Sequence, residues 1–576
     1  MTKKIVITGA GVVSAIGVGK AESLSSLLAA RTGIGRIKYL QTEHTELPAG
    51  EVKLSNNELQ SLVGVASDEG NLQSRNALIA RLALREALDE AGLNSPEEVA
   101  KMAFINGTTV AGMDRAEWTF TCAEPDEMKK ALLGSQSDCG TNTLDIARAF
   151  GSFSLLDTMS TACSSAANAL EFGANLIKTG RYERVVVGGT ESLSRLHFNG
   201  FNTLMILDRE LCRPFDESRA GLNLGEGAGY VVLESEASAL RRGVTPLAVL
   251  SGYANTCDAF HQTASSPEGE GAFLAMSKAI AMSGLTPEDV DYINAHGTGT
   301  PNNDPSELEA MHRLFGNSIP AYSSTKGFTG HTTSASGSIE AVFCILALQH
   351  QFLPVSLNCK NVIEGKPKPV TDGDKPVKEI RNILCNAFGF GGNDSSLLIS
   401  KYEKSEEVTD EVPALREVSA VTHILMDDAD PDFKQYMTPG EARRLGRMLK
   451  RTLAVSADAI RESGIERPDA IITGTKWGSI ESSELFLRDL LTYGEQMLKP
   501  THFMQSTHNT LGSLIAIQTK NHGYNCTHSQ GKDSLRVALL DAQMQIELGY
   551  IDTALVGLHD ALPEMHNEVF ILSAKS

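Results

Sequence analysis

The chain has 576 residues and 41% of them are hydrophobic, so it can bury several cores and is not a disordered protein. Its formal net charge of -20 argues against a nucleic-acid-binding protein, which needs a basic face, but does not exclude a local basic patch for an acidic protein partner. Nine cysteines without a C-x-x-C pair indicate neither a disulfide framework nor a zinc site, and they suit a reducing compartment. With no secretory signal at the start and no apolar run that could span a bilayer, we expect a cytoplasmic protein without membrane insertion.

Strand-like apolar runs alternate with amphipathic or small-residue helices along the first 400 or so residues. The predicted strands are residues 4–8, 103–105, 184–188, 230–234 and 291–295. The predicted helices are residues 74–91, 164–179, 271–282, 305–315 and 338–350. This alternation is typical of an α/β fold in which helices cover the sheets.

A short charged segment divides the chain. Residues 404–413 are weakly patterned, so we expect a linker between a first domain over residues 1–403 and a second over residues 414–576.

The second domain is a partial copy of the first. Residues 545–558 resemble residues 176–189, and the match of Gly549 with Gly180 sets an offset of 369 residues. This offset places Lys532 opposite Cys163. The copy ends before any counterpart of the later histidine segments, so we interpret it as a half-length unit without the thiol.

Cys163 lies where a predicted strand over residues 155–159 meets a helix of small residues that begins at Ser164. The macrodipole and the free N–H groups of a helix N-terminus favour a thiolate and can bind an oxyanion. The tight turn resembles a nucleophile elbow. A cysteine taken alone is more often an inert packed thiol, so the prediction of a nucleophile depends on motifs further along the chain.

Two histidines follow in similar loops. His296 comes directly after the predicted strand at residues 291–295 and opens a loop rich in Gly and Thr, and His331 lies in a second small-residue loop before the helix at residues 338–350. Each could be an ordinary turn histidine. Two such loops after a cysteine elbow indicate side chains that converge on one pocket.

These motifs resemble those of the elongating β-ketoacyl-ACP synthases, a branch of the thiolase superfamily. The matching stretches, in family order, are the Cys163 elbow, residues 213–216, 225–229, both histidine loops, 301–307 and 386–392. The resemblance implies a thiolase-like fold, a duplicated five-layered α-β-α-β-α arrangement, followed here by a partial thiolase-like unit. The opening residues 9–14 mimic a dinucleotide fingerprint, but Ser14 replaces its third glycine, so we reject that interpretation.

The resemblance implies an acyltransferase, a 3-oxoacyl-[acyl-carrier-protein] synthase that condenses an acyl group with malonyl-ACP and releases carbon dioxide. Cys163 would hold the acyl chain as a thioester. His296 and His331, as neutral imidazoles, would donate hydrogen bonds to the malonyl thioester and stabilise its enolate. Lys326 would order the site, with Glu340 as its partner.

Further residues take supporting roles by the same resemblance. The backbone N–H of Phe390 would complete an oxyanion hole with that of the cysteine, and its ring would gate the pocket. Thr298 and Thr300 would bind the phosphopantetheine arm of the carrier protein. Asp304 and Glu307 would support the first histidine loop, unless they are a solvated pair at a helix start. No metal or other cofactor of the enzyme's own is implied.

The sequence departs from the family pattern in three places. Residues 334–337 read Ser-Ala-Ser-Gly where Gly-Ala-Ala-Gly is common, Asn393-Asp394 stands where Thr-Asn is usual, and Gly299 replaces a serine. None of these changes removes a catalytic group. They put chain-length preference and gating in doubt and indicate a specialised branch.

The second unit resembles the chain-length factors, catalytically silent partners of type II polyketide synthases in which the active cysteine is replaced. Lys532 fits that pattern, but a shifted alignment would make it a surface lysine or make Cys526 the counterpart. Thiolase-type enzymes dimerise through their N-terminal halves. We therefore expect the half copy to dock beside the elbow as an intramolecular pseudo-partner that lines the acyl tunnel, with homodimerisation of the first unit as the alternative.

Acyl and malonyl thioesters on an acyl carrier protein are the implied substrates, in fatty-acid-like or polyketide synthesis such as that of flexirubin-type aryl polyenes. Carrier proteins are acidic, so a basic cluster should lie near the tunnel mouth, with Arg209 as the candidate. A degradative thiolase would need a second cysteine, which residues 388–393 lack. A chain-length factor without activity is the other alternative, and the intact cysteine, histidines and lysine argue against it.

Overall fold

The computed structural model describes residues 3–64, 73–122, 138–373, 378–426, 428–562 and 564–575. The strands of the first unit are β1 (Ile5–Ser14), β2 (Gly17–Val18), β3 (Gly35–Arg36), β4 (Pro48–Ala49), β5 (Ala103–Gly107), β6 (Leu155–Met159), β7 (Arg184–Glu191), β8 (Gly227–Ser235), β9 (Ala248–Cys257), β10 (Tyr292–Asn294), β11 (Ala321–Ser323), β12 (Asn382–Gly389) and β13 (Asn393–Ser400). Its α-helices are α1 (Lys20–Leu28), α2 (Asn56–Val63), α4 (Arg75–Ala91), α5 (Pro96–Val99), α6 (Met113–Cys122), α8 (Cys139–Arg148), α9 (Ser165–Lys178), α10 (Arg195–Thr203), α11 (Glu236–Arg241), α12 (Glu270–Ser283), α13 (Asn303–Phe315), α14 (Lys326–Thr329) and α15 (Ser336–His350).

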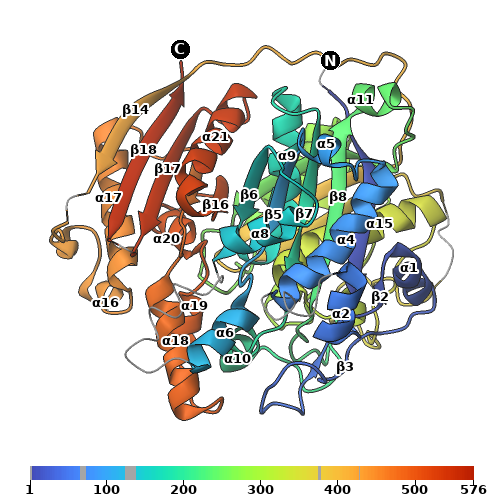
Figure 1. Ribbon diagram of the computed structural model, residues 1–576, viewed down its shortest axis with the longest axis horizontal. Coiled ribbons are helices and arrows are strands. Elements are labelled where there is room, and N and C mark those ends of the chain that lie inside the picture. Colours follow the sequence, from blue (N-terminus) through green and yellow to red (C-terminus); the bar gives the residue numbers. More distant parts are fainter. Residues whose placement is uncertain are drawn as a thin grey trace.

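The second unit has fewer elements. Its strands are β14 (Val418–Leu425), β15 (Ala470–Gly474), β16 (Tyr524–His528), β17 (Thr553–Asp560) and β18 (His566–Ala574). Its α-helices are α16 (Pro439–Ala442), α17 (Arg447–Ser463), α18 (Ile480–Tyr493), α19 (Pro500–Met504), α20 (Thr510–Thr519) and α21 (Ser534–Glu547). Figure 1 shows this unit in orange and red beside the blue-to-yellow first unit.

One long sheet runs through both units. Its strand order is β11-β10-β12-β13-β9-β1-β8-β7-β5-β6-β16-β15-β17-β18-β14, with β2 paired to β1 and β3–β4 forming a separate ribbon. In the first unit, the buried helices α9 and α15 pack on each other and on strands of both halves of the sheet, α9 on β5 and β7 and α15 on β8 and β12. Helix α4 covers β1 and β8 from outside, and α12 covers β9 and β13. This is the layered thiolase-like α/β fold that the sequence predicts.

Strand β1 is longer than predicted. The glycine-rich segment after residue 8, where the predicted strand ends, continues as strand and pairs with β8 down to Ser14. A Cβ atom on Gly11 would lie 2.0 Å from the carbonyl oxygen of Ala83. The glycines here therefore serve close packing of α4 on the strand rather than a turn or a phosphate site.

The segment between the units has no helix or strand from residue 401 to 417. In Figure 1 it runs across the top of the molecule from the first unit to β14. Asp410 ties it to the first unit by an ion pair with Arg241 (2.7 Å) and by a hydrogen bond that it accepts from Ser235 Oγ (2.9 Å). The linker is thus anchored along its path.

The second unit repeats the N-terminal half of the first. Strands β6 and β7, helix α9 and the 3₁₀ turn η2 (Ala162–Ser164) correspond to β16, β17, α21 and η6 (Gly531–Asp533), each displaced by the predicted 369 residues. The copied strands are ordered β16-β15-β17-β18-β14, as β6-β5-β7-β8-β1 are in the first unit. The partial duplication is confirmed.

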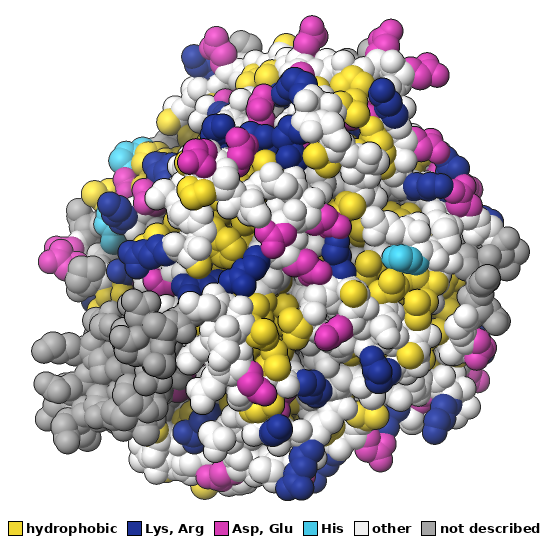
Figure 2. All heavy atoms as spheres, turned by 45° about the vertical axis from the view of Figure 1, so that its right-hand side comes forward, with side chains coloured by type: hydrophobic (Ala, Val, Ile, Leu, Met, Phe, Trp, Pro, Cys, Tyr) yellow, Lys and Arg dark blue, Asp and Glu magenta, His cyan; other side chains and the backbone are white. Residues whose placement is uncertain are grey.

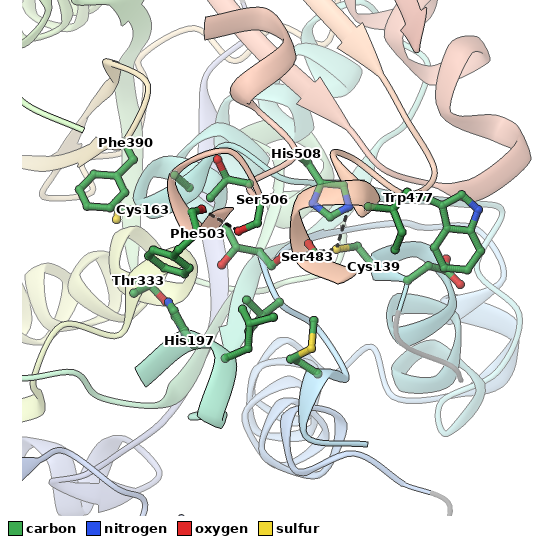
Figure 3. Close-up of a pocket in the computed structure, with 18 of the residues that line it drawn as sticks. Cys139, Cys163, His197, Thr333, Phe390, Trp477, Ser483, Phe503, Ser506 and His508 are labelled. Carbon is green, nitrogen blue, oxygen red and sulfur yellow. Dashed lines mark hydrogen bonds between the residues drawn. The ribbon is translucent and has the colours of Figure 1, made fainter. Parts of the chain in front are cut away.

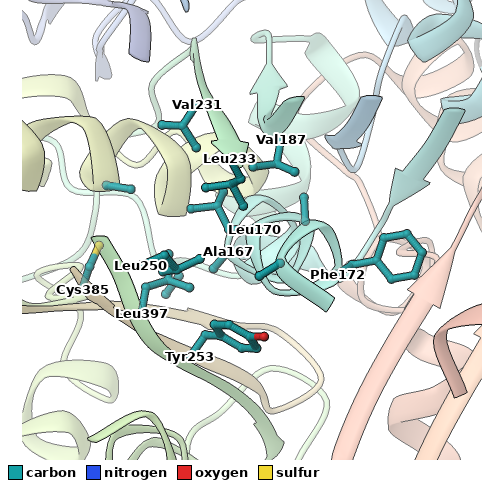
Figure 4. Packing of buried hydrophobic residues seen from close by; sticks show 14 of the residues in the cluster. Ala167, Leu170, Phe172, Val187, Val231, Leu233, Leu250, Tyr253, Cys385 and Leu397 are labelled. Carbon is teal, nitrogen blue, oxygen red and sulfur yellow. The ribbon is translucent and has the colours of Figure 1, made fainter. Parts of the chain in front are cut away.

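The two units join edge to edge. Strand β16 pairs antiparallel with β6, with His528 opposite Met159. The largest cluster of buried apolar side chains includes residues of α9 and of α21, and Figure 4 shows its part around Ala167, Leu170 and Val187. In the part of the chain that the structure describes, no helix is long and apolar enough to cross a membrane.

Candidate active site

Cys163 lies at the tight turn between β6 and α9. Ala162 adopts a left-handed backbone conformation, with a φ of 52°, and so turns the chain sharply just before the cysteine. Cys163 itself belongs to the 3₁₀ turn η2, from which α9 continues. The residue is only 5% exposed, so its sulfur is reached through cavities rather than from the open surface.

Both predicted histidines lie beside this sulfur. Nε2 of His331 is 3.1 Å from Sγ of Cys163, and the ring of His296 stands nearly perpendicular to that of His331, with centroids 5.2 Å apart. On the far side of the His331 ring, Nδ1 lies 3.1 Å from Oγ of Ser336. Segments from three distant parts of the sequence therefore converge on one buried point.

Burial sets the protonation of these groups. It raises the pKa of the Cys163 thiol to about 12, although the nearby Lys326 ammonium and the Phe390 N–H favour the anion. Burial also lowers the pKa of both His296 and His331 well below 6.5, and the Lys326 charge lowers each further. The imidazoles are neutral, as expected. The resting sulfur is a thiol, because loss of hydration outweighs the helix N-terminus that favours a thiolate.

Lys326 and Glu340 form the predicted pair. Nζ of Lys326 donates to Oε1 of Glu340 at 2.7 Å, and both residues are buried. Burial raises the pKa of the Glu340 carboxyl to about 7, and the adjacent ammonium opposes this. The pair places a fixed positive charge close to the cysteine and both histidines.

Asp304 and Glu307 are buried at the start of α13 and are not a solvated pair. Glu307 accepts hydrogen bonds from the backbone N–H groups of His296 and Gly297, both at 2.8 Å. Asp304 accepts from the backbone N–H groups of Phe215 (2.8 Å) and Gly299 (3.1 Å). Their carboxylates thus fix the shape of the loop that carries His296.

Phe390 lies in the turn between β12 and β13. Its backbone N–H is directed at the Cys163 sulfur, and its ring stacks on Phe201 with centroids 5.5 Å apart. Its carbonyl oxygen accepts a hydrogen bond from Nδ2 of Asn509 in the second unit, at 2.8 Å. The next residue, Gly391, has a φ of 84°, and a Cβ atom there would lie 2.1 Å from Oγ of Ser513. The loop is therefore held against the N-terminus of α20.

Two cavities meet at Cys163. The larger, of about 300 Å³, contains both histidines and is lined further by Thr298 and Thr300, whose hydroxyl groups are 2.9 Å apart. The smaller, of about 70 Å³, lies on the other side of Phe390. Phe201 and Phe390 line both cavities and so form the partition between them.

The second unit supplies much of the wall of the smaller cavity. Figure 3 shows Trp477, Ser483, Phe503, Ser506 and His508 of this unit facing side chains of the first unit. The ring of Phe503 packs edge-on against Phe201, with centroids 5.5 Å apart. The cavity behind the cysteine is thus shared between the two units.

Arg209 is exposed and lies between Asp208 and Glu210, and it is not among the residues that line the larger cavity, although Met205 and Ile206 are. Both of these acidic side chains form ion pairs with Arg213, at 3.1 and 2.5 Å. On the face shown in Figure 2, Lys and Arg side chains lie interspersed with Asp and Glu side chains.

Lys532 occupies the position of the cysteine in the second unit. It lies in the 3₁₀ turn η6 before α21, as Cys163 lies in η2 before α9, and it is exposed. Cys526 is instead buried within β16, where its sulfur lies 3.1 Å from Sδ of Met159. The shifted alignment that would make Cys526 the counterpart is therefore wrong.

Three side chains at the site were not predicted. Ser336 was noted only as a family departure, Asn386 donates to Glu307 at 3.1 Å, and Asn509 belongs to a unit without catalytic motifs. The serine departure was the one signal for Ser336 in the sequence, since it puts a hydroxyl five residues after His331 and directly before Gly337. Asn386 begins the matching stretch 386–392 but was given no role of its own, and Asn509 lies in no recognised motif.

Comparison with known families explains this architecture. The model of the beta-ketoacyl synthase N-terminal domain matches residues 2–239, that of the C-terminal domain matches residues 247–360, and a second N-terminal-domain model matches residues 418–571. The chain belongs to the β-ketoacyl synthase family. This β-ketoacyl synthase is 32% identical over 426 residues to 3-oxoacyl-[acyl-carrier-protein] synthase 2 of Staphylococcus aureus (strain COL). The matched region covers 70% of this chain and 99% of the relative.

Solved structures extend the match to the second unit. The ishigamide ketosynthase/chain length factor is 30% identical with a TM-score of 0.64, over 70% of this synthase and 100% of that chain. The PfaC keto synthase-chain length factor is 16% identical with a TM-score of 0.82, over 99% of this synthase and 78% of that chain. The second likeness shows that both units together share one known fold.

Proposed function

We propose that this protein is a 3-oxoacyl-[acyl-carrier-protein] synthase that elongates an acyl chain by decarboxylative condensation with a malonyl group on an acyl carrier protein. The observation that carries the proposal is the 3.1 Å approach of His331 to Cys163, beside a second neutral imidazole, where two cavities meet. The larger cavity would admit the phosphopantetheine arm, with Thr298 and Thr300 along it, and the smaller would receive the acyl chain.

In the first half-reaction, the Cys163 sulfur attacks the acyl thioester carbonyl. The bond from the carbonyl carbon to the pantetheine sulfur breaks, and the proton of the cysteine thiol ends on the released pantetheine sulfur. The backbone N–H groups of Cys163 and Phe390 would stabilise the intermediate oxyanion. Because the resting sulfur is a buried thiol, its proton must leave as the bond forms.

In the second half-reaction, malonyl-ACP loses carbon dioxide and the electron pair of the broken carbon–carbon bond forms an enolate. Neutral His296 and His331 would donate N–H hydrogen bonds to the enolate oxygen, as charge develops there. The enolate carbon attacks the acyl carbonyl carbon, the bond from that carbon to the Cys163 sulfur breaks, and the released thiolate takes up one proton from solvent. Lys326 would act through its charge, which keeps both imidazoles neutral.

The second unit supports a polyketide-type rather than a housekeeping role. Its exposed Lys532 cannot form a thioester, and it contributes to the wall of the cavity behind the cysteine. We infer that it acts as a catalytically silent chain-length factor for the first unit, which would place the enzyme in fatty-acid-like or aryl-polyene-type synthesis in the cytoplasm. Arg209 is the candidate contact for the acidic carrier protein.

The test combines the purified full chain with labelled acyl-ACP and malonyl-ACP. For Cys163→Ala we expect no labelled protein and no 3-oxoacyl product. For His331→Ala we expect partial acyl labelling but a loss of carbon dioxide release of about 100-fold, within the range for removal of one oxyanion donor. Lys532→Ala is the matched control at the corresponding turn of the second unit. It should retain both acyl labelling of Cys163 and carbon dioxide release. Condensation by Cys163→Ala would reject the proposal, and no labelling of the unaltered chain would favour a chain-length factor without activity.

A further inference from the structure

A buried ionic cluster lies at the junction of the two units. His528 of β16 contacts Asp157 of β6 through Nδ1 (2.8 Å to Oδ2) and Asp541 of α21 through Nε2 (3.1 Å to Oδ2), and all three residues are fully buried. Tyr524 also donates its hydroxyl hydrogen to Asp541 at 2.9 Å. Both ring nitrogens therefore face carboxylates, which raise the pKa of His528 to about 10 despite its burial. Asp157 belongs to the first unit and the other three residues to the second.

The backbone at this junction is nearly symmetric. Met159 and His528 face each other and are related by the offset of 369 residues. The N–H of Ser160 donates to Thr527 (2.9 Å), and the N–H of Ser529 donates to Thr158 (2.7 Å), so the two hydrogen bonds are related by the same offset. A local two-fold axis thus passes between Met159 and His528, and each contact across the junction has a counterpart.

The side chains break this symmetry. Asp157 corresponds to Cys526 by the same offset. Across the axis, Asp157 pairs with His528, whereas Cys526 contacts Met159 with its sulfur 3.1 Å from Sδ. One of the two related contacts is ionic and the other joins two sulfur atoms. The phenyl ring of Phe172 closes the ionic side, with its centroid 5.3 Å from that of His528, and Figure 4 shows it pointing toward strands of the second unit.

This asymmetry has a consequence for self-association. If two first units met through the same face, Asp157 of each would lie opposite Met159 of the other. Two carboxylates would then be buried against thioethers with no cation, which is strongly unfavourable. If two second units met, each His528 would lie opposite Cys526 and keep only one carboxylate. Only the mixed pairing places the imidazolium between two carboxylates.

We infer that Asp157, His528 and Asp541 form a buried ionic key that reserves the elbow face of the synthase unit for the chain's own half copy and excludes a second synthase unit. Specificity of this kind comes from a penalty on the wrong pairing rather than from extra affinity for the right one. Among these three residues, the pseudo-dimer gives Asp157 and Asp541 the same cation, His528, whereas a pair of first units would leave Asp157 without one.

The test uses the full chain with two variants and one control. In His528→Met, Asp157 stays buried without a cation, so the half copy should be displaced and cleavage of the linker by a protease should rise about tenfold or more. No new dimer should form, because a pair of first units would still bury two Asp157 carboxylates without a cation. The double variant Asp157→Leu with His528→Met has no buried charge at residue 157. Sedimentation over a concentration series should therefore show a dimer whose dissociation constant is at least about tenfold lower than in the single variant.

His423→Met is the matched control, a histidine of the same unit on the exposed edge strand β14 that pairs with Glu568. It should match the unaltered chain in protease resistance and in sedimentation. Two results would overturn the inference: wild-type protease resistance of His528→Met, or dimerisation of His528→Met as strong as that of the double variant. Should the single variant fail to fold, the double variant still decides, since absence of a dimer there shows that Asp157 does not bar self-association.

Discussion

Ser336 fixes how His331 presents its ring. Its hydroxyl lies 3.1 Å from Nδ1, while Nε2 faces the Cys163 sulfur. A hydroxyl that donates to Nδ1 leaves the ring hydrogen on Nε2, where it can bind an enolate oxygen. The alanine that the family resemblance would lead us to expect at this position has no hydroxyl group to donate.

Replacement of this serine should therefore slow the chemical step. In Ser336→Ala the loss of one buried hydrogen bond, about 1 kcal/mol, should lower kcat for condensation about fivefold and leave acyl labelling of Cys163 nearly unchanged. The control is Ser338→Ala on the same helix, whose hydroxyl donates to the carbonyl of Ala335 instead. Equal kcat values for Ser336→Ala and the unaltered chain would contradict this role.

At this scale the sequence predicted which groups meet and that both imidazoles are neutral, but not that the resting sulfur is a thiol. Cys163, His296, His331 and Lys326 stand in recognisable motifs, and each motif fixes its own backbone turn. The pKa of the thiol depends on its burial in the folded protein, which no local pattern records. Contacts such as that of Asn509 with Phe390 likewise exist only after the second unit docks.

Among the elements, the loop between β12 and β13 links the gate to the second unit. Asn509, just before α20, donates to the carbonyl oxygen of Phe390. This hydrogen bond helps to orient Phe390, whose own backbone N–H faces the Cys163 sulfur. Asn393 at the base of the loop donates to the carbonyl of Asn525 at 2.6 Å, so the second family departure also contacts the half copy. The loop that carries Phe390 is thus held partly by hydrogen bonds with the second unit.

Removal of the Asn509 amide should loosen this gate. In Asn509→Ala we expect the rate of acyl transfer to Cys163 to fall about tenfold in single-turnover experiments, and hydrogen exchange at residues 389–392 to rise. Gln518→Ala is the control, since this exposed residue lies on the same helix and donates to Tyr436 within the second unit. Unchanged exchange in Asn509→Ala would show that the hydrogen bond does not hold the loop.

The elements themselves were largely predictable, because periodicity and capping are local. Ser74 caps α4 as the helix prediction required, and α13 begins two residues before its predicted start. The junction was not predictable. Nothing in the sequence around residue 528 indicates a charged contact, and only the fold shows that His528 is buried between two carboxylates.

In the whole molecule, the duplication explains why a chain of this length forms one sheet. The half copy lacks a second half of its own and extends the first unit at β6, so the two units share a core and a cavity. A linker over residues 404–413 could be inferred from the sequence, but its anchoring by Asp410 depends on where the fold places Arg241 of the first unit.

His197 should give this shared cavity a measurable acid sensitivity. It lies against Phe201 of its own unit and Phe503 of the second, with centroids 5.1 and 6.5 Å away, and burial lowers its pKa to about 4. Its pKa in the unfolded chain is near 6.5. As the pH falls below that value, the unfolded state binds a proton that the folded state does not bind. Its contribution to stability is therefore complete above pH 6.5 and is lost as the pH falls toward 4.

Between pH 8 and pH 5 the unaltered protein should lose about 2 kcal/mol more of its free energy of unfolding than His197→Gln does, as measured by urea denaturation. His261→Gln is the control, because it replaces an exposed histidine whose hydration changes little on unfolding. Between pH 8 and pH 5 it should lose as much free energy of unfolding as the unaltered chain. If His197→Gln and the unaltered protein lost stability in parallel over this range, the histidine would have to be protonated or hydrated in the folded state. The cavity wall between the two units would then be open to water.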